Sequence, residues 1–121
     1  MGYRSEVAFT LSHRAKEDIL LKGQASLCEE DYELLESILS DEEADAYHEN
    51  ESGVYVHHHN MKWYADYPEI SLIETYISEH PEEAALFRIG EDYTDVEHYG
   101  MFDEVKRLMI SSNIIALDAE A

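Results

Sequence analysis

The sequence predicts an α+β fold, in which one antiparallel sheet carries helices on one face, within a single domain of residues 1–121. Segments of alternating apolar side chains predict strands, segments with helical apolar spacing lie between them, and turn residues separate the two kinds. The chain is 45% hydrophobic and 11% aromatic. It can therefore bury a core, unlike a disordered acidic tail.

The chain begins with a strand followed by a helix. The strand is predicted from Ser5 to Leu11, and its buried face is formed by Val7, Phe9 and Leu11. Ser12 is the expected N-cap of a helix from His13 to about Lys22. Gly23 is expected to end that helix.

A second helix is expected after a capping box at Ser26 to Glu29. Its apolar stripe consists of Leu27, Leu34, Leu35, Ile38 and Leu39. Acidic side chains occupy its first turn, where the helix dipole favours anions. The two helical segments are also readable as one broken helix.

The middle of the chain predicts a hairpin. Its arms are Glu42 to His48 and Val54 to Tyr64, joined by the turn-like segment Glu49 to Gly53. Pro68 is then expected as the first residue of a helix. That helix is expected to stop at His80, which precedes a proline.

Strands are predicted at Ala85 to Ile89 and at Val96 to Tyr99, whereas Val105 to Leu117 fits either strands or a short helix. The main elements follow the order strand, helix, strand, strand, helix, strand. This is the split βαββαβ order of the ferredoxin-like fold, followed here by a C-terminal extension.

Charge restricts what the protein can approach. The chain has 28 acidic and 8 basic residues, which give a formal net charge of -20. No Lys or Arg occurs between Gly23 and Met61, a stretch with 11 acidic residues. Such a field repels nucleic acid and anionic membranes and attracts basic surfaces. We therefore expect no direct binding to nucleic acid or membrane.

Compartment and assembly are predicted from a few residues. The single cysteine, Cys28, cannot form an internal disulfide, and no apolar stretch has the length of a signal peptide. A cytoplasmic location in a host cell is expected. We expect a monomer or a homodimer, and residues 101–121 either complete the sheet or mediate dimerisation.

No strong catalytic motif is present, so we expect a protein that is not an enzyme and has no cofactor. Cys28 lies near a helix N-terminus, but the acidic residues after it disfavour a thiolate. A second acidic cluster, which fits a solvated hairpin turn, consists of Glu91, Asp92, Asp95 and Glu97. Arg88 can pair with one of these carboxylates.

The histidine run His57 to His59 is the candidate metal site. On a strand, His57 and His59 share a face, and zinc needs a third protein ligand, for which many carboxylates are near in the sequence. We nevertheless predict no metal and expect partly buried sheet histidines. A small ligand could alternatively bind this face, through Tyr55, His57, His59 and Trp63. An enzyme that uses His57 or His59 with a carboxylate is the weakest alternative.

Three short signatures are Gly2-Tyr3-Arg4-Ser5, Lys62-Trp63-Tyr64 with Pro68, and Arg88-Ile89-Gly90-Glu91-Asp92. Together they resemble small, mostly uncharacterised acidic proteins of bacteriophages and other mobile elements. The resemblance implies an intracellular protein that acts during infection, and it implies no catalytic residue.

The leading hypothesis combines that context with the charge: an anti-defence inhibitor, similar in role to anti-CRISPR proteins. It would mimic DNA and block a basic host protein or nucleoprotein complex. The partner-binding residues are expected to be Glu29, Glu30, Glu33, Glu36, Asp41, Glu42, Glu43 and Asp45. The alternative is an acidic surface that serves only solubility.

Overall fold

The computed structural model describes residues 4–91, 94–102, 104–105, 108–111 and 114–117. Its elements in chain order are β1 (Ser5–Ser12), α1 (His13–Ser26), α2 (Glu29–Leu39), β2 (Ala46–Glu49), β3 (Gly53–Met61), α3 (Pro68–Glu79), β4 (Ala84–Gly90), β5 (Val96–Gly100), β6 (Leu108–Ser111) and β7 (Ile114–Leu117). Within these residues, no helix is both long and apolar enough to cross a membrane.

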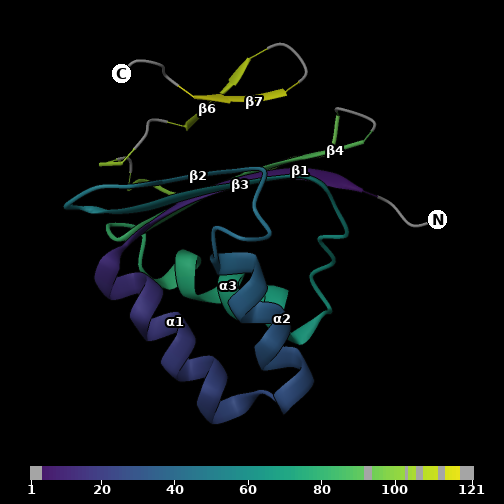
Figure 1. The fold of residues 1–121 in the computed structure, drawn as a ribbon. Helices are drawn as coiled ribbons and strands as arrows, with labels where there is room; N and C mark the ends of the chain where they lie inside the picture. Colours follow the sequence, from purple (N-terminus) through teal and green to yellow (C-terminus); the bar gives the residue numbers. More distant parts are fainter. Residues whose placement is uncertain (1–3, 92–93, 103, 106–107, 112–113, 118–121) are drawn as a thin grey trace.

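Five strands form one antiparallel sheet in the order β2-β3-β1-β4-β5. The three helices lie on one face of this sheet, and the β6–β7 hairpin lies over the other face (Figure 1), which we call the outer face. The predicted α+β class with helices on one face is confirmed. The predicted ferredoxin-like order is not confirmed, because β5 pairs with β4 and the order of the five strands differs from the prediction.

The main core lies between the helices and the sheet, where Phe9, Leu35 and Ile73 are fully buried. A smaller apolar cluster on the outer face contains Ala8, Tyr55 and Ile89. The central strand β1 is therefore buried on both faces, which corrects the expectation of one buried face. The chain after β5 covers part of the outer face, where the Thr10 hydroxyl donates a hydrogen bond to the carbonyl oxygen of Phe102.

The predicted start of α1 is confirmed, whereas the predicted end of α1 and the predicted cap of α2 are wrong. The Ser12 hydroxyl caps α1 by accepting the backbone N–H of Ala15 at 3.0 Å. Gly23, however, does not end the helix. It lies inside α1, where an added Cβ would come within 2.4 Å of Leu35 Cδ2 on α2. The predicted Ser26 capping box is also wrong, because Ser26 belongs to α1 and Cys28 is the N-cap of α2.

The predicted hairpin is confirmed as β2 and β3, and Pro68 is confirmed as the start of α3. The segment that fitted strands or a helix forms the two strands β6 and β7. They pair with each other and do not extend the main sheet.

Candidate functional site

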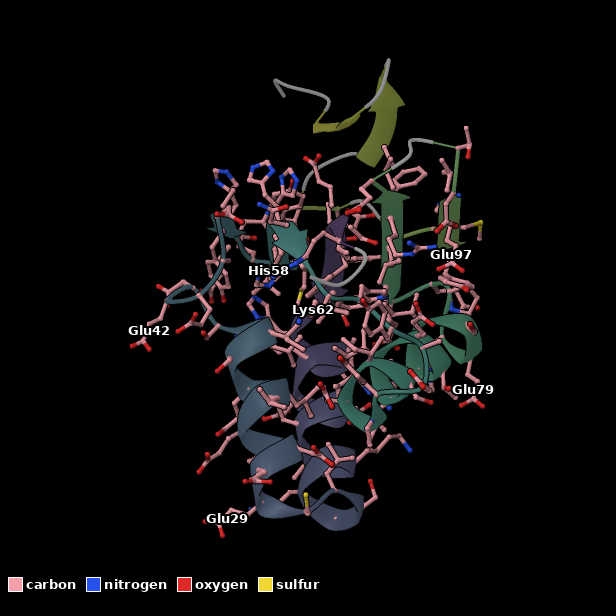
Figure 2. The ribbon with its side chains drawn as sticks, turned by 90° about the vertical axis from the view of Figure 1, so that its right-hand side faces the viewer. Glu29, Glu42, His58, Lys62, Glu79 and Glu97 are labelled. Atoms are coloured by element: carbon pink, nitrogen blue, oxygen red, sulfur yellow. The ribbon has the colours of Figure 1, made fainter. Side chains whose placement is uncertain are left out.

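The predicted partner-binding residues are all exposed and come from α2 and the loop between α2 and β2. We call them the acidic α2 surface: Glu29, Glu30, Glu33, Glu36, Asp41, Glu42, Glu43 and Asp45. Figure 2 shows Glu29 and Glu42 pointing outward near opposite ends of this surface. The structure thus brings the predicted residues onto one continuous segment of surface.

Helical periodicity explains how α2 presents this charge. Leu35, Ile38 and Leu39 are buried against the core. Residues four and seven positions apart share a helix face, so Glu29, Glu33 and Glu36 line the exposed face. Burial of the apolar stripe thus fixes the direction in which the carboxylates point.

Within the described part of the chain, no lysine or arginine forms an ion pair with the acidic α2 surface. Among the described residues, the ion pairs that involve Lys or Arg are those of Arg88 with Asp95 and Glu97, which lie away from α2. Negative charge is not confined to α2, because Glu79 and Glu97 lie on the other side of the molecule in Figure 2. The α2 surface is distinguished by carboxylates that form no ion pair with Lys or Arg among the described residues.

The second predicted site is only partly assembled. Tyr55, His57 and His59 line up on the outer face of β3: the Tyr55 and His57 ring centroids are 6.1 Å apart, and those of His57 and His59 are 4.5 Å apart. Trp63 lies elsewhere. Its ring packs 6.3 Å from the ring of Phe9 in the main core, and its Nε1 donates a hydrogen bond to Glu74 Oε2 at 2.7 Å.

A register shift separates Trp63 from the other three residues. Ser5 pairs with Met61 and Val7 pairs with His58, so three steps along β3 match two steps along β1. Asn60, within this bulge, has a positive φ of 40°. Because one extra residue exchanges the two faces of a strand, the alternation that placed Trp63 with His59 fails there.

The bulge brings Glu6, a residue that the sequence did not single out, against both histidines. His57 Nε2 donates a hydrogen bond to Glu6 Oε2 at 2.8 Å, and His59 Nδ1 lies 3.2 Å from the same oxygen. Burial lowers the pKa of His57, while the hydrogen bond to Glu6 opposes that shift. Alternation along β1 places Glu6 on the outer face, but only strand pairing shows which residues it meets.

His58 points to the helical face, as alternation predicts, and its Nε2 donates a hydrogen bond to the carbonyl oxygen of Ile38 at 2.8 Å. Beside it, an open groove of about 610 Å³ runs between α2, α3 and the end of β3. Lys62 lines this groove together with Glu43 and Asp45. The groove therefore marks the border of the acidic α2 surface.

The remaining residues that the sequence analysis considered are Cys28 and the second acidic cluster. Cys28 is exposed. In the second acidic cluster, Asp95 and Glu97 bind Arg88, as expected for a paired arginine. Glu91 accepts the backbone N–H of Arg4 at 3.0 Å. Outside the described residues lie Asp92 of this cluster and two residues of the first signature, Gly2 and Tyr3.

Comparison of the chain with models of protein families, with curated protein sequences and with solved structures finds no significant match.

Proposed function

We propose that the protein binds a cationic surface of a partner protein through the acidic α2 surface and so occupies a site that would otherwise hold nucleic acid. The observation that carries the proposal is the set of eight exposed carboxylates on α2 and the following loop. They lie in a stretch of sequence without Lys or Arg. Unneutralised charge of one sign attracts a surface of the opposite sign.

The carboxylates on one face of α2 form a row of charge, as the phosphates of a nucleic-acid strand do. The α-helical rise places Glu33 about 6 Å from Glu29, and Glu36 about 4.5 Å from Glu33, along the helix axis. Phosphates along one strand of duplex DNA are about 3.4 Å apart along its axis. The carboxylates are therefore spaced more widely than phosphates, and long, flexible lysine side chains in a phosphate-binding groove would have to bridge the difference.

The proposed partner is a nucleic-acid-binding protein or nucleoprotein complex of a bacterial host. The basic character follows from charge complementarity, and the host context follows from the resemblance to bacteriophage proteins. Because the interaction is mainly between exposed charges, its association rate and affinity should fall as salt screens them.

The test compares two variants with the same loss of charge. One carries Glu29→Gln, Glu33→Gln and Glu36→Gln on α2, and the control carries Glu17→Gln, Glu79→Gln and Glu82→Gln at exposed positions elsewhere. Immobilised protein is exposed to bacterial lysate at low and high salt, and the captured proteins are eluted with duplex DNA.

Wild-type protein and the control variant should capture the same DNA-eluted proteins at low salt, and the α2 variant should lose them. Equal capture by the two variants would show that the location of the lost charge does not matter, and it would overturn the assignment of binding to the α2 surface. Capture that duplex DNA does not reverse would contradict the nucleic-acid-mimic part of the proposal.

For the fold, we propose a relation to the ferredoxin-like arrangement in which β5 is an added edge strand and the first crossover contains two helices. The proposal is supported by the neighbours β2-β3-β1-β4, all of which pair antiparallel. The helical segments that follow β1 and β3 both lie on one face, as that arrangement requires (Figure 1).

A further inference from the structure

Three side chains from two strands converge at the edge of the outer face. Glu6 comes from β1, and His57 and His59 come from β3. One nitrogen or oxygen atom of each residue lies within 4.8 Å of the corresponding atoms of the other two. Glu6 is thus the carboxylate that the fold places beside the histidine pair as a third ligand.

We propose that Glu6, His57 and His59 bind a zinc ion. Bonds of about 2.0–2.2 Å at tetrahedral angles place neighbouring zinc ligands about 3.3–3.6 Å apart. Glu6 Oε2 lies 2.8 Å from His57 Nε2 and 3.2 Å from His59 Nδ1. The ion is therefore admitted when the Glu6–His57 separation widens by about 0.5–0.8 Å and the Glu6–His59 separation by about 0.1–0.4 Å. His57 then carries its hydrogen on Nδ1 instead of Nε2.

The ligand types favour a transition metal over magnesium or calcium. Imidazole nitrogen suits zinc and its first-row neighbours, whereas magnesium and calcium prefer oxygen ligands. Two imidazoles with one carboxylate form a known set of protein ligands for zinc sites that retain an open position. The strongly negative chain also attracts cations to this site.

Asp45 fixes the backbone that carries the two histidines. Its Oδ2 accepts the N–H of His59 at 2.6 Å, and its own N–H donates to the carbonyl oxygen of His57 at 2.8 Å. On the other side of the bulge, Arg4 Nη1 donates to the carbonyl oxygen of Asn60 at 3.0 Å. These contacts hold His57 and His59 in place before any ion binds, which lowers the cost of ordering the ligands.

The site is open on one side. His57 is buried, with its side chain 11% exposed, whereas the His59 side chain is 57% exposed. A cavity of about 260 Å³ is bordered by Glu6, His59 and Glu91. An ion held by three protein ligands would therefore have room for water at its fourth position.

An independent observation on the same face points to a missing partner. The hydroxyl of Tyr55 is fully buried and has no hydrogen-bond partner among the described residues. Tyr55 is two residues from His57, and its ring meets the His57 ring edge-on. Because buried polar groups are normally satisfied, an orphan hydroxyl beside the cluster is typical of a site that lacks its water or ion.

The experiment uses full-length protein without a polyhistidine tag, stripped of metal with a chelator. Zinc is titrated calorimetrically in the presence of excess Mg²⁺, which occupies weak carboxylate sites. The variants are Glu6→Gln and His59→Ala, which avoid the buried His57. The matched control is His98→Ala, because His98 is also exposed and lies on a strand outside the cluster.

Wild-type protein and His98→Ala should each bind one zinc ion per chain, and zinc should raise the melting temperature of both. Loss of a group that merely supports a metal ligand costs about 10–100-fold in affinity, so loss of a ligand should cost more than that. Circular dichroism checks that Glu6→Gln and His59→Ala remain folded. The proposal would be overturned if the wild type did not bind stoichiometric zinc. It would also be overturned if Glu6→Gln and His59→Ala bound zinc with the affinity of the wild type.

Discussion

The hydroxyl of Tyr76 donates a hydrogen bond to Asp18 Oδ2 at 3.0 Å, which joins α3 to α1 beneath the sheet. Burial, followed by the bond to Asp18, raises the pKa of Tyr76 to about 12. Tyr55, on the opposite face, has a buried hydroxyl without such a partner in the described part of the chain. Burial raises the pKa of Tyr55 as well.

These two tyrosines predict opposite effects of the same substitution in metal-free protein. Tyr76→Phe should lower the free energy of unfolding by about 1 kcal/mol, because the hydrogen bond to Asp18 is lost. Tyr55→Phe should leave it unchanged or raise it, because an unsatisfied hydroxyl is removed from the interior. Urea unfolding followed by circular dichroism measures both. An equal loss in the two variants would show that the Tyr55 hydroxyl has a partner.

Glu74 predicts a pH dependence of stability. Burial raises the pKa of Glu74, against the hydrogen bond from Trp63. The folded state therefore binds a proton more readily than the unfolded state. The stabilising contribution is present below the ordinary glutamate pKa and is lost as the pH rises through the raised one.

The variant Glu74→Gln should remove this part of the pH dependence, because the amide oxygen still accepts the Trp63 N–H but cannot ionise. Unfolding is followed from about pH 4, just below the ordinary glutamate pKa, to about pH 7. The signal is the fluorescence of Trp63, the single tryptophan. The exposed Glu79→Gln on the same helix is the control. Equal slopes for Glu74→Gln and wild type would contradict the prediction.

Substitution of Arg88 should destabilise the protein even when the new residue is lysine. Its buried guanidinium donates to Glu97, Asp95 and Ser5, at 3.0, 2.8 and 2.9 Å. Lysine cannot reproduce three divergent donors, so Arg88→Lys should cost about 2 kcal/mol of unfolding free energy.

The two carboxylates that pair with Arg88 should matter less. The side chains of Asp95 and Glu97 are 43% and 38% exposed, so Asp95→Asn or Glu97→Gln should cost less than about 1 kcal/mol each. Chemical denaturation compares these variants with Arg88→Lys. A smaller loss in Arg88→Lys than in either of them would contradict this account.

Gly23 should be required for the contact between α1 and α2. Alanine favours a helix, but its Cβ would come within 2.4 Å of the buried side chain of Leu35. Overpacking normally outweighs the gain in helix propensity, so Gly23→Ala should lower the free energy of unfolding by about 1 kcal/mol. Gln24→Ala, at the next and exposed position, should not be destabilising. A stabilised Gly23→Ala would show that α2 shifts freely.

Local signals in the sequence predicted much of the fold. Ser12 and Pro68 mark the starts of α1 and α3 because capping and a fixed φ act over only a few residues. The sequence alone does not predict the role of Gly23, because that role depends on Leu35, which approaches from another helix. The strand β5 was expected, and it pairs with β4, its neighbour in the chain. The order of the five strands depends instead on the pairing of β1 with β3 and β4, which are distant from it in the sequence.

For the candidate sites, the sequence predicted which side chains are exposed better than it predicted which side chains lie close together. All residues of the acidic α2 surface are exposed, as their periodicity and charge indicated. Strand alternation also placed Tyr55, His57 and His59 together. It failed for Trp63, because the bulge at Asn60 exchanges the faces of the strand.

The amino-acid sequence alone determined the excess of negative charge, the α+β class and the side of α2 that faces solvent, because composition and short-range periodicity decide these properties. Only the tertiary structure decided that Glu6 meets His57 and His59, because the register between β1 and β3 is set by packing of the whole sheet.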